Sequence, residues 1–191
     1  NKAINRYKKD NYEISEDKSK KLELLKKEIM NLKNCELKKQ AKNIVFCDGN
    51  PKSKIMLIGE APGANEDQEG LPFVGRAGIL LDKMLSAIRL DRKKLYIYNI
   101  INYRPPDNRR PTEEEIKRYL PFIIKHIEII NPKILILLGS TAMNALIGKD
   151  VVISKMRGQW IEKKIGNCKT SIIITFHPCL LYTSDAADER S

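Results

Sequence analysis

Three polar residues, Glu60, Asn99 and His177, each stand at or near the end of a short apolar run. A carboxylate can act as a general base, an imidazole can donate or accept a proton, and an amide can donate and accept hydrogen bonds at once. Taken singly, each residue has an ordinary explanation as a surface carboxylate, a turn amide or a structural histidine. Their shared placement after apolar runs favours a common site instead.

The apolar runs are the elements that must position these side chains. Ile55–Ile58 is too short for a helix and too uniformly apolar for a half-exposed strand, which predicts a central strand covered on both faces. Further buried strands are predicted at 95–101, 134–138 and 171–176. The carboxyl ends of parallel strands share one edge of the sheet, where ligands bind, so we expect the three polar side chains to converge there.

Helical patterns separate the predicted strands. The spacing of apolar residues and the turn signals predict helices at 17–33, 77–88, 112–130 and 142–147. Thr112 and Glu115 form a capping box at the start of the third helix, and Pro121 predicts a kink or a late start in it. We also expect a short strand within 43–51, an acidic loop after Gly63 and a hairpin around 166–167.

This alternation predicts an α/β fold, a three-layer α/β/α domain with a four-stranded, mainly parallel central sheet. The domain is expected to span residues 18–178, after a loose N-terminal arm at 1–17. Residues 179–191 contain no lysine in a lysine-rich chain and resemble the translation of a sequencing adapter. We therefore expect them to be a non-native tail and the natural sequence to continue differently after Pro178.

Composition narrows the class of protein. The 191 residues include 35 Lys and Arg against 24 Asp and Glu, a formal net charge of +11 that favours nucleic acid as a partner. No apolar run approaches bilayer length and no secretory segment is seen, so we expect a soluble, cytoplasmic protein, and a monomer. The four cysteines include no C-x-x-C pair, which argues against a disulfide framework or a zinc knuckle.

Several separated motifs resemble family 4 uracil-DNA glycosylases, in their order and spacing over about residues 32–178. They are Gly59-Glu60-Ala61-Pro62-Gly63, Glu66-Asp67, Pro72 to Gly78, Asn99, Arg104 to Arg109, Arg157-Gly158-Gln159-Trp160 and His177-Pro178. The resemblance implies a DNA repair glycosylase that hydrolyses the bond between uracil and the sugar of a flipped-out nucleotide. No lysine is placed as a Schiff-base nucleophile, so we expect a monofunctional enzyme that leaves an abasic site.

The resemblance also implies roles for single residues. Glu60 would stabilise the sugar cation and orient the attacking water, and His177, neutral or charged, would donate a hydrogen bond to uracil O2. Asn99 would pair with uracil O4 and N3–H, Phe73 would stack on the ring, and Ala61 would contact the substrate. Glu66 or Asp67 could position water or the loop, but a solvated acidic loop is at least as good an interpretation.

Contacts to DNA are expected from basic residues on the loops at this edge. The candidates for phosphate contacts are Arg104, Arg109, Arg110, Lys155 and Arg157. In the family an apolar wedge follows the His-Pro pair and holds the duplex open. Here that position falls in the suspected tail, at 179–181.

Iron is where the sequence departs from the family. Typical members hold a 4Fe–4S cluster with four cysteines, and the matching positions here are Leu32, Cys35, Tyr103 and Tyr119. One thiolate cannot hold such a cluster, so we expect no cluster. We expect no other metal or organic cofactor either, because water is the nucleophile in the reaction that the resemblance implies.

Two other classes remain as alternatives. The same fold could serve a non-catalytic DNA-binding or nucleotide-binding module, against which the joint presence of Glu60, Asn99 and His177 argues. A phosphate-binding protein that uses the turn 59–63 is disfavoured, because the turn matches neither common phosphate-loop motif and Glu60 would repel phosphate. Within the enzyme class, activity on hypoxanthine or xanthine also stays open.

Overall fold

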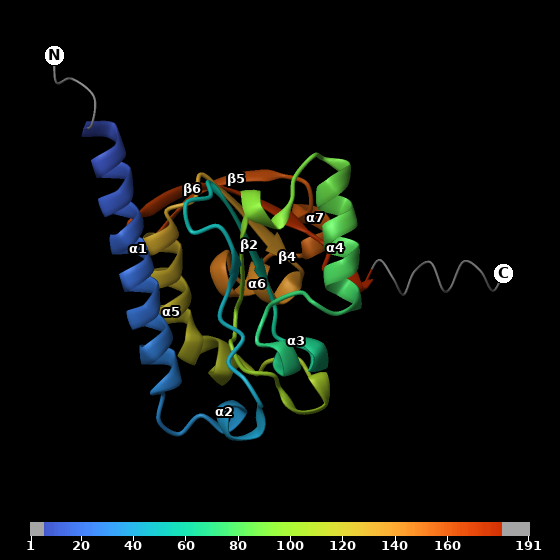
Figure 1. Cartoon of the computed structure of the whole chain (residues 1–191). Coiled ribbons are helices and arrows are strands. Elements are labelled where there is room, and N and C mark those ends of the chain that lie inside the picture. The colour runs from blue at the N-terminus through green and yellow to red at the C-terminus, as the bar shows by residue number, and fades with distance from the viewer. Residues whose placement is uncertain (1–5, 181–191) are drawn as a thin grey trace, which may run out of the picture.

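A computed structural model of the chain describes residues 6–180 (Figure 1). At its centre is a six-stranded sheet in the order β1-β3-β2-β4-β6-β5. The strands are β1 (Asp48–Gly49), β2 (Ile55–Gly59), β3 (Tyr96–Asn99), β4 (Ile134–Leu138), β5 (Trp160–Ile165) and β6 (Cys168–Thr175). The middle four strands are parallel, and β1 and β5 pair antiparallel at the two edges.

The prediction of a mainly parallel sheet is therefore confirmed. The sheet has six strands, whereas four were expected. The four apolar runs are the four parallel strands, and the expected hairpin joins β5 to β6, with Ile165 opposite Cys168. The edge strand β5 alternates exposed and partly buried residues, so its sequence carries no uniform apolar run. The edge strand β1 has two residues, too few for any periodic pattern.

Helices cover both faces of the sheet, which confirms the three-layer arrangement. They are α1 (Arg6–Met30), α2 (Glu36–Gln40), α3 (Ala64–Glu69), α4 (Arg76–Ala87), α5 (Glu113–Ile130), α6 (Ser140–Leu146) and α7 (Ile153–Met156). One core packs α1, α5 and α6 against one face, and a smaller core packs α4 against the other (Figure 1). Among residues 6–180, every helix is too short or too polar to span a bilayer.

Two local expectations need correction. Helix α1 begins at Arg6, so residues 6–17 are helical and not a loose arm, while 1–5 lie outside the described residues. The segment expected as an acidic loop contains the short helix α3. Helix α5 begins with the predicted capping box of Thr112 and Glu115 and continues through Pro121. The expected tail is described only at Cys179 and Leu180, because 181–191 lie outside the described residues.

A buried polar cluster joins α5 to the sheet. The His126 side chain is fully buried among the rings of Phe46, Tyr96 and Tyr98, and its Nε2 lies 2.6 Å from the Tyr96 hydroxyl. Burial lowers the pKa of His126 from 6.5 to about 3, because the charged imidazolium would lose its hydration. The folded protein therefore keeps this histidine neutral well below neutral pH.

We predict that His126 makes the protein acid-sensitive. In the unfolded chain His126 binds a proton as the pH falls below 6.5, whereas in the folded chain it binds one only near pH 3. The free energy of unfolding should fall by up to about 1.4 kcal/mol per pH unit across this window. Urea denaturation of wild type and of His126→Gln, which cannot titrate, should show a gap that changes with pH only below 6.5. A gap independent of pH would contradict the prediction.

Candidate active site

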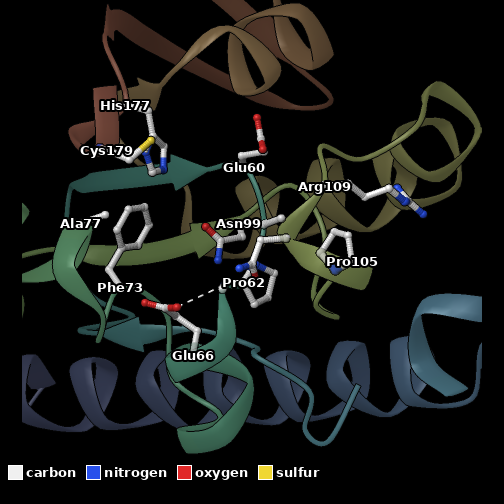
Figure 2. A pocket seen from close by; sticks show the side chains of 13 residues that line it. Glu60, Pro62, Glu66, Phe73, Ala77, Asn99, Pro105, Arg109, His177 and Cys179 are labelled. Atoms are coloured by element: carbon white, nitrogen blue, oxygen red, sulfur yellow. Dashed lines mark hydrogen bonds between the residues drawn. The ribbon is translucent and has the colours of Figure 1, made fainter. Parts of the chain in front are cut away.

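A pocket of about 230 Å³ lies beyond the carboxyl ends of β2, β3 and β6 (Figure 2). It is smaller than the roughly 300–1,000 Å³ typical of sites for drug-sized ligands, so it suits one small ring. The structure brings together in it all five residues expected to perform catalysis or hold the base. The lining residues are Glu60, Ala61, Pro62, Gly63, Glu66, Phe73, Ala77, Asn99, Pro105, Asn108, Arg109, His177 and Cys179.

The Asn99 amide is the most buried polar group of the pocket. Asn99 is the last residue of β3, pairs in register with Gly59 and is 2% exposed. Its Oδ1 is buried and has no hydrogen-bond partner among the described residues. A Cβ atom at Gly59 would lie 2.5 Å from both Asn99 Oδ1 and Phe73 Cζ. The absence of a side chain at Gly59 therefore lets the amide and the aromatic ring meet over the end of β2.

The Glu60 carboxylate is held by a residue that the sequence analysis did not identify. The Thr141 hydroxyl donates a hydrogen bond to Glu60 Oε2. Thr141 is buried in the first turn of α6, just after β4. It is thus the polar group that the fourth parallel strand brings to the same edge of the sheet. In the sequence, Thr141 could have been found as a polar residue that closely follows the apolar run 134–138.

His177 follows β6 and faces the aromatic wall of the pocket. Its ring stacks on that of Phe73, with 5.7 Å between centroids and 25° between planes. Burial lowers the pKa of His177, although the carboxylates of Glu60 and Glu66 oppose this shift. The backbone N–H of Cys179 donates to Nδ1 at 3.3 Å. These observations favour a neutral imidazole whose proton is on Nε2.

Phe73 stands in a loop held by unusual backbone packing. Its φ of 56° is left-handed, a conformation that costs a non-glycine residue free energy. The Glu66 carboxylate ties the two ends of the loop together, accepting from Gly63 N at 3.1 Å and Gly75 N at 2.7 Å. A Cβ atom at Gly78 would lie 1.7 Å from the Phe73 carbonyl oxygen, so only glycine permits this approach.

Asp67 and most of the basic candidates lie outside the pocket lining. The buried Asp67 carboxylate accepts from the backbone N–H groups of Lys42 and Asn43, at 2.9 and 3.1 Å, and so anchors a neighbouring loop. Arg109 lines the pocket but forms a two-pronged ion pair with Glu115. Among the other candidates, Arg104 bonds Asn108, Arg157 stacks on Phe176, and Arg110 and Lys155 are exposed.

The four positions expected to replace cluster ligands are packed into the core. Cys35, Tyr103 and Tyr119 are buried, Leu32 packs against the same core, and Cys35 Sγ lies 3.5 Å from the Tyr119 hydroxyl. Burial raises the pKa of both tyrosines. Among the described side chains, no three His, Cys, Asp or Glu are grouped so that they could hold a metal ion. One thiol and two phenols do not fit an iron–sulfur cluster, which needs thiolates.

Comparison with known proteins finds matches over most of the chain. Residues 46–189 match the model of the Uracil DNA glycosylase superfamily. A Type-4 uracil-DNA glycosylase of Thermotoga maritima is 39% identical over 170 residues, 88% of this chain and 87% of the relative. The protein of that name from Archaeoglobus fulgidus is 37% identical, over 85% and 84% of the two chains. The one from Saccharolobus solfataricus is 41% identical, over 82% and 75%.

We predict that Gly78→Ala destabilises the protein although it lies within a helix. Glycine to alanine in a helix normally adds about 0.5–1 kcal/mol of stability. Here the new methyl group would collide with the Phe73 carbonyl, so overpacking should instead cost about 1–3 kcal/mol. Denaturation curves would measure the difference, with Ser86→Ala on the exposed side of α4 as the control. A stabilised Gly78→Ala variant would refute the close packing described above.

Proposed function

Because the chain belongs to the Uracil DNA glycosylase superfamily, we propose that it removes uracil from DNA by hydrolysing the N-glycosidic bond. The observation that carries this proposal is the buried Oδ1 of Asn99, which lines a small pocket and has no hydrogen-bond partner among the described residues. Glu60 and His177 line the same pocket from two other strands. The curated relatives with the name Type-4 uracil-DNA glycosylase cover most of the chain and support the same activity.

Recognition of the base would depend on Asn99 and Phe73. An amide can donate from Nδ2 to uracil O4 and accept the uracil N3–H at Oδ1, whereas cytosine reverses that pattern. The bound base would thereby satisfy the Oδ1 atom that is otherwise buried without a partner. Phe73 would stack on the ring, with Ala61 beside it. A base within a duplex cannot reach such a pocket, so the nucleotide would be flipped out of the helix.

Bond cleavage would separate charge that the pocket can stabilise. As the bond from C1′ to N1 breaks, its electron pair leaves with uracil and positive charge develops on the sugar. Glu60, held by Thr141, would stabilise that cation and orient the water that adds to C1′. His177 would donate from Nε2–H to uracil O2 as negative charge develops there. The proton lost by the water balances the charge of the uracil anion.

The product would be an abasic site with the DNA backbone intact. A glycosylase that also cuts the backbone needs an amine to attack C1′, and none of the described residues lining the pocket is a lysine. Water is then the only nucleophile required. The basic residues near the pocket and the net charge of +11 would hold the DNA through its phosphates. We further propose that the protein acts as a cytoplasmic monomer.

We also propose that the enzyme works without an iron–sulfur cluster. The hydrogen-bonded pair of Cys35 and Tyr119, with Tyr103 and Leu32, would fill by packing the volume that a cluster and its ligands fill in typical members. The described residues that line the pocket do not include these four positions. Catalysis would therefore need neither their side chains nor a metal.

We predict that uracil release depends on Glu60 and Asn99. Release from a labelled single-stranded oligonucleotide, with abasic sites revealed by alkali, should fall about a hundredfold or more in Glu60→Gln and in Asn99→Ala. Without alkali the strand should stay intact. Glu69→Gln, an exposed carboxylate on α3, is the matched control and should keep wild-type activity. A folded protein that binds uracil-containing DNA but releases nothing would favour the non-catalytic binding module.

We predict that the purified protein contains no stoichiometric iron. Anaerobic incubation with iron and sulfide should add neither iron nor visible absorbance, because the four positions supply one thiol. Iron analysis, with activity before and after a strong chelator, is the measurement. Iron at four atoms per chain, or activity lost to the chelator, would contradict a cluster-free enzyme.

A further inference from the structure

Arg92 lies outside the pocket yet reaches the loop that carries Phe73. It begins a short 3-10 turn, Arg92–Lys94, which leads into β3. Its Nη1 donates to the Pro72 carbonyl at 3.0 Å, and its Nη2 donates to the Phe73 carbonyl. The guanidinium thus binds two successive backbone carbonyls in a loop that is distant in sequence.

Two carboxylates hold this guanidinium in place. Arg92 Nε lies 2.8 Å from Asp82 Oδ1 on α4, and Nη1 lies 2.8 Å from Asp48 Oδ2 in β1. The Arg92 side chain is 24% exposed, so these bonds are partly shielded from water. These ion pairs fix the orientation of the guanidinium and offset the cost of removing it from water. Three elements, β1, α4 and the turn before β3, therefore converge on the Phe73 loop through one side chain.

The position of the Phe73 ring depends on how the Phe73 carbonyl is held. Phe73 has a left-handed backbone, which an isolated chain would leave for a more favourable conformation. Its carbonyl oxygen accepts from the Arg92 guanidinium and lies so close to Gly78 that a Cβ atom there would collide with it. Rotation of that backbone would move the ring away from the backbone of Gly59 and from the ring of His177, beside which it now lies.

We propose that Arg92 is a positioning residue for uracil recognition, which fixes the ring of Phe73 against the flipped base by holding the Phe73 carbonyl. This inference rests on the proposed function. Arg92 does not touch the base, so its effect passes entirely through Phe73. Lysine cannot replace it, because one ammonium cannot span two carbonyls and two carboxylates with the geometry of the planar fork.

The test measures binding of the base separately from binding of DNA. Inhibition by free uracil reports the aromatic wall, and affinity for an oligonucleotide with an abasic site reports the phosphate contacts. In Arg92→Lys the inhibition constant of uracil should rise about tenfold or more, since small misplacements of a positioning group carry large losses. Affinity for abasic DNA should stay within about twofold, a change too small to indicate a lost contact.

A double-mutant cycle identifies the route of the effect. In a Phe73→Ala background, Arg92→Lys should change the uracil inhibition constant by less than about twofold, because the ring that it positions is gone. Arg118→Lys is the matched control, since Arg118 also donates to two backbone carbonyls, those of Lys33 and Asn34, but does not line the pocket. Asp82→Asn, which loosens Arg92 without removing it, should give an intermediate effect and serves if Arg92→Lys unfolds.

Each outcome decides between the proposals. An unchanged uracil inhibition constant in both Arg92→Lys and Asp82→Asn would overturn the positioning role. An equal loss with and without the Phe73 ring would also overturn it, because the effect would then be one of general stability. If wild type releases no uracil, the proposed function fails and the inference about Arg92 fails with it. If wild type releases uracil but Asn99→Ala and Phe73→Ala leave release unchanged, the function stands, while base recognition by this pocket and the positioning role of Arg92 are both overturned.

Discussion

The pocket depends on four parallel strands whose carboxyl ends are aligned at one edge of the sheet. The register pairs Gly59 with Asn99 across β2 and β3, and Leu138 with Thr175 across β4 and β6. The residues at the strand ends are thereby delivered to one edge from segments more than a hundred positions apart. Strands covered on both faces cannot shift their register without burying the polar residues that flank them, so the sequence specifies this alignment strongly. A carboxylate, an amide and an imidazole can then share a pocket for one small ring.

A second constraint is that the aromatic wall approaches the strand ends more closely than side chains normally permit. Glycine at positions 59 and 78 removes the atoms that would intervene, and Phe73 pays for the approach with a left-handed backbone. Charged side chains then bind the backbone of the loop: Glu66 joins its two ends by their N–H groups, and Arg92 takes the carbonyls. The loop is held by its main chain, which leaves the Phe73 ring to face the pocket.

The core beside α1, α2 and α5 contains a thiol and two phenols that are shielded from water. Cys35, Tyr103 and Tyr119 are buried with Leu32 beside them, and the thiol and a phenol partner each other. These side chains pack between α1, α2 and α5 as part of one continuous core. The polar cluster around His126 packs against the same core. Its polar groups also partner each other, since the neutral imidazole shares a hydrogen bond with the Tyr96 hydroxyl.

The sequence by itself determined the parts of this protein that follow from local pattern. Uniform apolar runs predicted the four parallel strands, and the polar residues at the ends of three of them, Glu60, Asn99 and His177, line one pocket as expected. Only the tertiary structure decided which other residues support them. Thr141 and Arg92 are ordinary in sequence and acquire a role because distant elements bring them to Glu60 and to the Phe73 carbonyl. The edge strands and the early start of α1 were missed because short or polar segments carry no periodic signal, and their structure depends on the neighbours they pair with.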